Sequence, residues 1–395
     1  MRPGSAEEAA ALLRELAEAK PVTTPPAEAG SEARQEGRAV RPRGGGTKDW
    51  GPPIDAVDVE TGGLNRILEH NVGDFTAILE AGVPMAEAQA AFAEHGQMLA
   101  LDPALNGSAT VGGIMATSDS GPMRHRYGSL RDLVVGATVA LSDGTLATSG
   151  GKVIKNVAGY DLAKLFTGSF GTLGLIVRMA VRLHPLPPTT VSAVGATDDP
   201  DRLGAAAVAL AAQPLEADCL DVDWRDGAGR LLVRFGSAAA SHQAAATVSR
   251  MQGLGLEECA AVDDDDELWM RQRVHQRGEC ILKVSGRATD LPAVCRAGGA
   301  VVGRPALGLY WLSLPLARPA ASSPQSTPSA LDAEAVAAAR AALSPRACTL
   351  LDAPEALRAD AWAAPEAGAL VVMSRIKERF DPARIFRPGT FVGGI

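Results

Sequence analysis

The 395-residue sequence is poor in residues that bind iron–sulfur clusters or metal ions. It has five cysteines, widely spaced and without a Cys-x-x-Cys pair, and six histidines that are isolated from one another. This cysteine spacing excludes a self-contained ferredoxin-type motif, and the odd number argues against a disulfide framework. No pair of histidines has the spacing of metal ligands. We therefore expect no metal site and a reducing compartment.

Long apolar runs and an excess of basic charge are also missing. The first twenty residues, which include Glu7 and Glu8, lack the basic-then-apolar pattern of a secretion signal, and no apolar run of about eighteen residues occurs. The net charge is -8, with lysine and arginine scattered along the chain. Scattered basic residues argue against a nucleic-acid partner. We expect a cytoplasmic protein of two or three domains with no transmembrane segment.

Glycine, in contrast, is placed in distinctive ways. Between residues 150 and 176, glycines recur among apolar residues, where they mark tight turns or places at which another molecule approaches the backbone. A large flat ligand would need such a surface, although turns that serve packing alone are the alternative. Gly44, Gly45 and Gly46 follow a predicted strand over residues 38–43. Consecutive backbone N–H groups in such a loop favour a bound diphosphate, and a hairpin-like turn is the alternative there.

The pattern of predicted elements indicates an α+β fold. A helix over residues 6–20 is predicted with Ser5 as its N-cap, and a hairpin over residues 133–149 turns at Asp143-Gly144. Short strands alternate with single helices rather than forming a doubly wound parallel sheet. Beyond Pro185, residues 189–252 read as strand, helix, two strands and helix, which resembles half of a ferredoxin-like domain.

Six motifs occur in an order that is typical of one flavoprotein family. They are Arg-Gly-Gly-Gly-Thr at 43–47, Asp-Pro at 102–103, Thr-Val-Gly-Gly at 110–113, Tyr-Gly-Ser-Leu-Arg-Asp at 127–132, Lys-Asn-Val-Ala-Gly-Tyr-Asp-Leu at 155–162 and Gly-Ser-Phe-Gly-Thr-Leu-Gly at 168–174. The sequence thus resembles the vanillyl-alcohol-oxidase (PCMH-type) FAD-binding family, and within it the FAD-binding E subunits of bacterial glycolate oxidases. The resemblance covers roughly residues 40–185 and returns at 380–389.

The resemblance implies three segments. A PCMH-type FAD-binding domain would cover residues 1–187, and an antiparallel α+β cap domain would cover residues 188–370. Residues 371–395 would return to the FAD-binding domain. In this last segment Arg387 stands where relatives have asparagine before Pro-Gly, so the contact that the asparagine would make near the flavin is in doubt.

The resemblance also implies a set of cofactor-binding residues. Residues 43–47 match the loop that binds the FAD diphosphate, residues 110–113 and 117–121 match segments along the flavin and ribityl chain, and residues 168–176 match the segment that holds the adenosine half. The implied residues are Arg43, Gly44, Gly45, Gly46, Thr47, Thr110, Gly112, Gly113, Thr117, Ser118, Gly121, Gly168, Gly171, Thr172, Gly174 and Ile176. Covalent members carry a histidine in or near the diphosphate loop. This loop has none, so we expect non-covalent FAD.

Catalytic residues are not identified by the resemblance. Lys152, Lys155, Asn156, Tyr160 and Asp161 belong to a motif that we expect to position the cofactor rather than to catalyse. Related D-type subunits carry a His-x-Gly-Asp-Gly-Asn-x-His pattern, which this sequence lacks.

Three functions remain open at this stage. The first is an FAD-binding subunit that oxidises glycolate or a similar 2-hydroxy acid beside a sister D-type flavoprotein and an iron–sulfur F-type subunit, with the complex in the cytoplasm or at the inner face of the membrane. The second is a non-catalytic FAD-binding partner of such a flavoprotein. The third is a stand-alone alcohol or aldehyde oxidoreductase with Arg287 or Tyr310 at its substrate.

Overall fold

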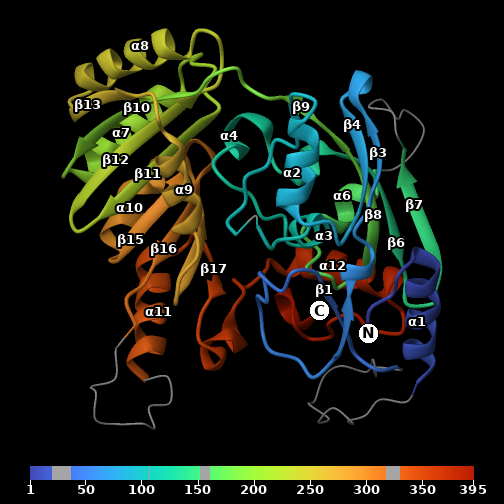
Figure 1. The fold of residues 1–395 in the computed structure, drawn as a ribbon. Coiled ribbons are helices and arrows are strands. Elements are labelled where there is room, and N and C mark those ends of the chain that lie inside the picture. The colour runs from blue at the N-terminus through green and yellow to red at the C-terminus, as the bar shows by residue number, and fades with distance from the viewer. Residues whose placement is uncertain (20–36, 106, 152–160, 317–329) are drawn as a thin grey trace, which may run out of the picture.

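The chain forms two α+β regions, each built on its own β-sheet (Figure 1). The computed structural model describes residues 1–19, 37–105, 107–151, 161–316 and 330–395. The first region holds the N-terminal half of the chain and the C-terminal segment, and the second region follows residue 190. The α+β class and the antiparallel second region were both predicted from the sequence, and both are confirmed.

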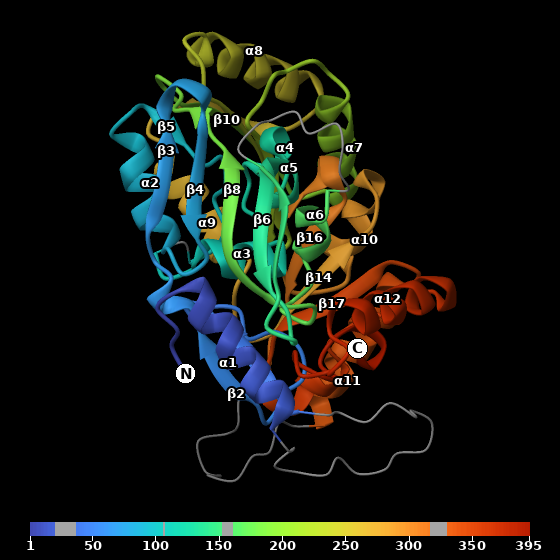
Figure 2. The same ribbon diagram turned by 90° about the vertical axis from the view of Figure 1, so that its right-hand side faces the viewer.

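The first region is organised around a five-stranded antiparallel sheet in the order β3-β4-β8-β6-β7. Figure 2 shows β3, β4, β8 and β6 side by side. The strands are β3 (Ile67–Asn71), β4 (Thr76–Glu80), β6 (Val134–Ala140), β7 (Leu146–Gly150) and β8 (Leu175–Arg182). The predicted hairpin is confirmed, because β6 and β7 pair across Asp143-Gly144 with Gly144 at φ +81°.

Both faces of this sheet are buried. On one face, side chains such as Ile176 and Met179 pack with the helices into one core, and on the other face Leu175 and Val177 pack against the first helix. The helices are α1 (Ala6–Glu18), α2 (Met85–Ala93), α3 (Val111–Thr117), α4 (Arg124–Tyr127), α5 (Leu130–Leu133) and α6 (Ala163–Phe166). Helix α1 begins as predicted, with the Ser5 side chain accepting a hydrogen bond from the Glu8 backbone N–H.

A smaller element joins the two ends of the chain. Strands β1 (Val40–Arg43) and β2 (Val57–Glu60) form a parallel pair, and Phe386 adds a parallel bridge to Val40. Phe386 follows the C-terminal helix α12 (Ala367–Phe380). Strands β5 (Gln97–Met98) and β9 (His184–Pro185) form a further short pair. The β1–β2 pair therefore receives support from a segment more than 300 positions away in the sequence.

The second region is one eight-stranded sheet made of two similar units. In each unit the chain runs strand, helix, strand, strand, helix, strand, and the strands lie in the spatial order 4-1-3-2, which is the ferredoxin-like arrangement. The two units join edge to edge through β11 and β15. The first consists of β10 (Val191–Thr197), α7 (Pro200–Ala211), β11 (Cys219–Arg225), β12 (Ala228–Phe235), α8 (Ala240–Gly253) and β13 (Glu257–Val262).

The second unit repeats this order after the connecting helix α9 (Asp266–Val274). It consists of β14 (Ile281–Ser285), α10 (Leu291–Arg296), β15 (Ala300–Arg304), β16 (Leu309–Ser313), α11 (Ala330–Leu343) and β17 (Ala347–Asp352). The sequence predicted the first unit only. Helices α7, α8, α10 and α11 supply side chains to the core that covers one face of the sheet, and the opposite face is turned toward the first region (Figure 1).

Side chains alternate between these two faces along β16. Tyr310 and Leu312 lie in the helix-covered core, whereas Trp311 packs on the opposite face against Val302 and Trp50. Because Trp50 belongs to the first region, this contact connects the two regions. None of the helices in the described part of the chain combines the length and the apolar character that a transmembrane helix requires.

Candidate functional site

The loop of residues 44–47, called here the glycine loop, packs directly on the segment that begins α3. A Cβ atom on Gly44 would lie 2.1 Å from Thr110 Oγ1, and one on Gly45 would lie 1.7 Å from the Ser108 carbonyl oxygen. Gly46 has φ +67°, a conformation that side chains other than glycine seldom adopt. Close packing and backbone conformation thus explain why three consecutive glycines follow β1.

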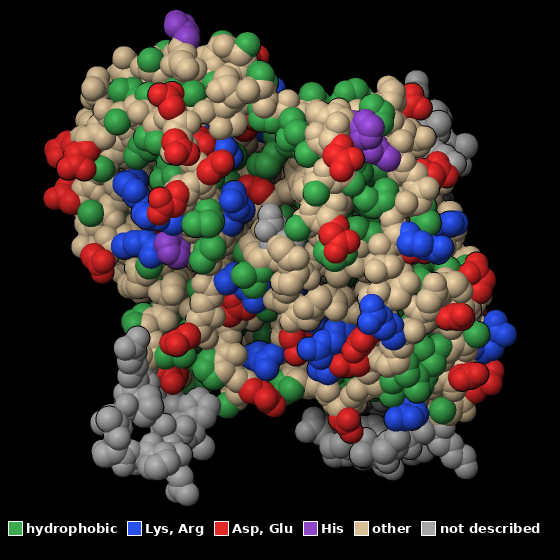
Figure 3. All heavy atoms as spheres, in the orientation of Figure 1, with side chains coloured by type: hydrophobic (Ala, Val, Ile, Leu, Met, Phe, Trp, Pro, Cys, Tyr) green, Lys and Arg blue, Asp and Glu red, His purple; other side chains and the backbone are tan. Residues whose placement is uncertain are grey.

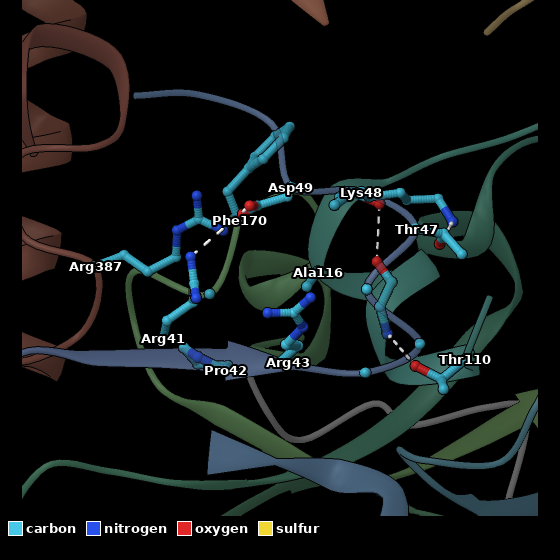
Figure 4. A pocket seen from close by; sticks show the side chains of 16 residues that line it. Arg41, Pro42, Arg43, Thr47, Lys48, Asp49, Thr110, Ala116, Phe170 and Arg387 are labelled. Carbon is cyan, nitrogen blue, oxygen red and sulfur yellow. Dashed lines mark hydrogen bonds and ion pairs between the residues drawn. The ribbon is translucent and has the colours of Figure 1, made fainter. Parts of the chain in front are cut away.

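The glycine loop offers hydrogen-bond donors. Within the described residues, no hydrogen bond uses the backbone N–H groups of residues 44–47. The loop forms one wall of a cavity, called here the loop cavity, with cationic side chains around it (Figure 4). Its lining residues are Arg41, Pro42, Arg43, Gly44, Gly45, Gly46, Thr47, Lys48, Asp49, Thr110, Gly113, Ala116, Thr117, Phe170, Gly171 and Arg387. Free N–H groups and cations together favour an anion.

Two of these cations are held in place by one carboxylate. Arg41 Nε lies 2.6 Å from Asp58 Oδ1, and Arg43 Nη1 lies 3.0 Å from Asp58 Oδ2. The hydrogen bond from Arg41 holds the pKa of Asp58 below its usual range. Since Asp58 lies on β2, the parallel strand pair orients both guanidinium groups at the loop cavity.

Arg387 reaches the loop cavity from the C-terminal segment. It is buried, with φ +43°, and it donates hydrogen bonds to the Trp50 carbonyl at 2.9 Å and to Thr390 Oγ1 at 3.3 Å. Burial lowers the pKa of Arg387. From the sequence, Arg387 was noted only because relatives have asparagine at this position. In the structure it lies beside Arg41 and Arg43 (Figure 4).

A second cavity, called here the aromatic hollow, lies between the two regions. It is lined by Trp50, Thr117, Ser118, Asp119, Ser120, Gly168, Phe170, Lys283, Ser285, Trp311, Thr349, Leu351, Trp362, Phe391 and Val392. Thr117 and Phe170 line both cavities, so the two cavities adjoin. The Phe170 ring centroid lies 4.8 Å from that of Trp362 and 5.1 Å from that of Phe391. Such walls suit a flat aromatic ring.

The wall shared by the two cavities is shaped by positive backbone dihedral angles. Ser118 has φ +51° and Phe170 has φ +54°. The Gly168 N–H donates to the Met115 carbonyl, and the Phe170 N–H donates to the Ala116 carbonyl. The glycine-rich segment from residue 168 therefore docks on the C-terminal end of α3, which places the Phe170 ring between the two cavities.

A buried ion pair lies at the same junction. Lys48 Nζ is 3.4 Å from Asp119 Oδ2, and both side chains are less than a tenth exposed. Burial lowers the pKa of Lys48, and the charge of Asp119 opposes that shift. Lys48 lines the loop cavity and Asp119 lines the aromatic hollow, so the pair connects their walls.

The structure brings most of the predicted cofactor-binding residues to these two cavities. Those that line the loop cavity are Arg43, Gly44, Gly45, Gly46, Thr47, Thr110, Gly113, Thr117 and Gly171. Ser118 and Gly168 line the aromatic hollow. Sequence reasoning did not assign Ala116, Phe170, Trp362 or Phe391 to the site, because nothing in a lone apolar residue distinguishes a cavity wall from a core.

The other predicted residues line neither cavity and take part in packing. A Cβ on Gly112 would lie 2.6 Å from the Cβ of Ala81, and one on Gly121 would lie 1.7 Å from the Asp102 carbonyl oxygen. Gly174 packs in the same way against Val139. Thr172 and Ile176 are buried, the former bonded through Oγ1 to the Ser169 carbonyl.

Several further candidates lie away from the cavities. Tyr310 is buried in the core and donates a hydrogen bond to the Arg287 carbonyl. Neither Tyr310 nor Arg287, which were suggested for a stand-alone oxidoreductase, lines the aromatic hollow. Asp161 pairs with Lys164 at 2.8 Å. Lys152, Lys155, Asn156 and Tyr160 lie outside the described residues.

Comparison with known proteins bears on the N-terminal part of this site. Residues 27–150 match the family model described as an FAD binding domain. The chain contains an FAD-binding domain. The FAD-binding residues predicted at the glycine loop and at Thr110 and Gly113 lie within the matched segment.

Curated relatives share this part of the chain. Over 192 residues the chain is 33% identical to the mitochondrial D-lactate dehydrogenase [cytochrome] of Arabidopsis thaliana, covering 49% of this chain and 31% of the relative. It is 36% identical to glycolate oxidase subunit GlcD of Bacillus subtilis, covering 38% of this chain and 33% of the relative. It is 34% identical to glycolate oxidase subunit GlcE of Escherichia coli, and the match covers 36% of this chain and 41% of the relative. The matches thus span a third to two fifths of these relatives.

Solved structures share the whole architecture. An alkyldihydroxyacetonephosphate synthase superposes with a TM-score of 0.71 at 16% identity, covering 99% of this chain and 77% of that chain. The Bermuda grass isoallergen BG60 superposes with a TM-score of 0.67 at 13% identity, and the superposition covers 98% of this chain and 89% of that chain. At these identities the likeness concerns the fold alone. The arrangement of two adjoining α+β regions is therefore shared with proteins of diverse sequence.

The residues of the two cavities fit FAD. The glycine loop leaves no room for a Cβ atom on Gly44 or Gly45, and it presents N–H groups beside cationic side chains, as a diphosphate requires. The adjoining aromatic hollow presents flat rings and small hydroxyl side chains, as an isoalloxazine ring requires.

Proposed function

We propose that FAD binds with its diphosphate at the glycine loop and its ring system toward the aromatic hollow. Residues 44–47 would donate backbone hydrogen bonds, while Arg41, Arg43 and Arg387 would balance the negative charge. The regions meet around the hollow, so the aromatic walls would exclude water from the ring.

We further propose that the chain is the FAD-binding subunit of a glycolate, or other 2-hydroxy acid, oxidase or dehydrogenase complex. The names of the curated relatives support this, since they refer to D-lactate, glycolate and D-2-hydroxyglutarate, which are all 2-hydroxy acids. Oxidation of such an acid to the 2-oxo acid releases two electrons and two protons, and bound FAD supplies the electron-accepting chemistry. The observation that carries the proposal is the aromatic hollow, which adjoins the loop cavity and whose lining includes one half-buried lysine from the second region.

Electrons would then pass to partner subunits. All five cysteines are unpaired and none belongs to an iron–sulfur motif, so we propose an iron–sulfur F-type subunit as the electron acceptor beside a D-type flavoprotein. Unpaired cysteines also support a reducing compartment such as the cytoplasm, with the complex at the inner face of the membrane. We place the boundaries of the FAD-binding domain at residues 1–187 and 371–395, with the cap at 188–370.

A non-catalytic role for the subunit is the second candidate, and the lining of the aromatic hollow favours it. Among the residues that line the hollow, Asp119 is the sole carboxylate, it pairs with Lys48, and no histidine is present. Proton removal from a hydroxyl group usually needs such a base. The sister flavoprotein would then oxidise the acid, and this chain would hold its FAD as an electron carrier or a structural group.

One measurement separates these candidates. We expect the purified chain, supplied with FAD and desalted, to retain a visible flavin absorption band. Bleaching of this band on anaerobic addition of glycolate or D-lactate to the chain alone would establish direct oxidation. A band that bleaches only when the partner subunits are added would establish the non-catalytic role, and a chain that retains no flavin would contradict both.

A further inference from the structure

Lys283 is the cationic side chain that the second region contributes to the aromatic hollow. It lies on β14 between Trp311 of β16 and Thr349 of β17, which are its cross-strand neighbours on the same face. Its Nζ lies 5.8 Å from the centroid of the Trp311 ring. Side chains of one β-strand alternate between faces. Lys283 is therefore directed toward the first region, whereas Leu282 and Val284 enter the helix-covered core.

Lys283 has no acidic partner in the part of the chain that the structure describes. Among the described residues, neither a hydrogen bond nor an ion pair involves its ammonium group. Two nearby cations do have acidic groups beside them, because Lys48 pairs with Asp119 and Arg304 Nε lies 4.0 Å from Asp221 Oδ1. Asp119 is thus already engaged. The wall of the hollow carries an uncompensated positive charge at Lys283.

Lys283 is half-buried, and an ammonium group that loses water without gaining a partner is destabilised, so a bound anion would relieve that cost. We propose that the Lys283 ammonium group binds the carboxylate of the small acid that enters the aromatic hollow. This inference rests on the proposed function, because it assigns a residue to the substrate of the same site. The ligand class is a small monocarboxylate or dicarboxylate bearing a 2-hydroxy group.

The rest of the hollow is suited to such an acid. Ser118, Ser120, Ser285 and Thr349 contribute hydroxyl groups to its lining, and these can bond to the second carboxylate oxygen or to the substrate hydroxyl. Lys283 comes from the second region, whereas the glycine loop comes from the first. The second region would therefore hold the acid and the first region the diphosphate, and the substrate would lie where the two regions meet.

Trp311 and Arg304 lie next to the proposed carboxylate-binding lysine. The Arg304 guanidinium carbon lies 4.5 Å from the centroid of the Trp311 ring, and Arg304 is fully buried. The same ring lies beside Lys283 and lines the hollow. We regard Trp311 as the positioning residue that separates the two cations, which would otherwise repel each other.

The test is a titration of the FAD-loaded chain with sodium oxalate, a dicarboxylate that has no C–H bond to oxidise. Isothermal titration calorimetry gives the Kd, and the flavin absorption spectrum gives a second, independent readout. We expect Lys283→Met to weaken oxalate binding at least about tenfold, because an ionic hydrogen bond is lost. Lys283→Arg keeps the charge and should stay within about threefold. Lys164→Met, at a partly exposed lysine of α6 outside both cavities, is the matched control and should leave the Kd unchanged.

The pH dependence of binding supplies a further signature. Burial first, and then the charges of Arg124 and Arg304, lower the pKa of Lys283 to about 8, whereas Asp119 opposes the shift. Oxalate binds the protonated amine, so the affinity should fall as pH rises above about 8. The arginine variant stays charged throughout and should show a flat profile up to pH ~10.

The outcomes distinguish this inference from the proposed function. A chain that retains no FAD overturns the proposed function and this inference with it. An FAD-loaded Lys283→Met variant that binds oxalate as tightly as the wild type overturns the lysine subsite alone. Lys283→Gln is a second neutral variant, which provides the same test if the methionine variant does not fold.

Discussion

Gly46→Glu should yield a folded chain that no longer binds FAD. A Cβ atom at this position would lie 3.2 Å from Arg43 Nη2, so the new carboxylate would both pair with Arg43 and occupy the place of an anion. At an effective dielectric constant of about 20, two like charges about 5 Å apart repel by about 3 kcal/mol, which corresponds to roughly a hundredfold loss of affinity. The measurement is the flavin absorbance per mole of protein after reconstitution with FAD and desalting.

Two variants at the same position separate charge from backbone strain. Gly46→Gln has the size of glutamate without its charge, and Gly46→Asn tolerates the positive φ of +67° best among the non-glycine residues. We expect both to lose a few-fold in affinity and to retain flavin. Equal flavin content in the glutamate variant and the wild type would show that the diphosphate binds elsewhere.

Lys377→Met should destabilise the chain by about 3 kcal/mol, because it leaves a buried carboxylate without its cation. Lys377 Nζ donates to Asp381 Oδ2, to the Thr172 carbonyl and to the Phe386 carbonyl, each at 2.7 Å. Lys377 is 2% exposed and Asp381 is 0% exposed. Since these bonds hold the segment that carries Arg387, FAD affinity should fall as well. Chemical denaturation and flavin retention measure the two effects.

A neighbouring ion pair of the same region provides the control. Arg384 and Glu378 lie 3.6 Å apart, and the glutamate side chain is 60% exposed. Exposed pairs contribute little to stability, so Glu378→Gln should change the free energy of unfolding by less than about 0.5 kcal/mol. If Lys377→Met had an equally small effect, the buried pair would not hold the C-terminal segment in place.

The part of the site that could be predicted from sequence is local in the chain. Consecutive glycines after a strand, flanked by Arg43 and Thr47, imply donors that point at an anion, and a short window contains that whole pattern. The hollow is different, because Trp50, Lys283 and Phe391 meet only after both sheets have formed. No spacing rule relates residues so far apart.

Glycines that serve packing and glycines that serve binding could not be told apart in the sequence. Gly112 and Gly113 are adjacent, yet Gly112 is pressed against Ala81 while Gly113 lines the loop cavity. The two differ because successive residues of a helix point in directions about 100° apart. The second ferredoxin-like unit was missed for a related reason. Its helix α10 has 6 residues, too few for a periodic pattern.

The position of Arg387 has a consequence for how the protein matures. Strand β1 is flanked on one side by β2 and on the other by Phe386, so the floor of the loop cavity stays unfinished until residue 387 has been synthesised. Domains generally fold as units, beginning with the N-terminal part during translation. In this protein the N-terminal half cannot complete the loop cavity before residues 386 and 387 have been synthesised. At the proposed site, the newly made polypeptide would therefore have no high-affinity place for its flavin during translation, and cofactor binding would be a late step of assembly.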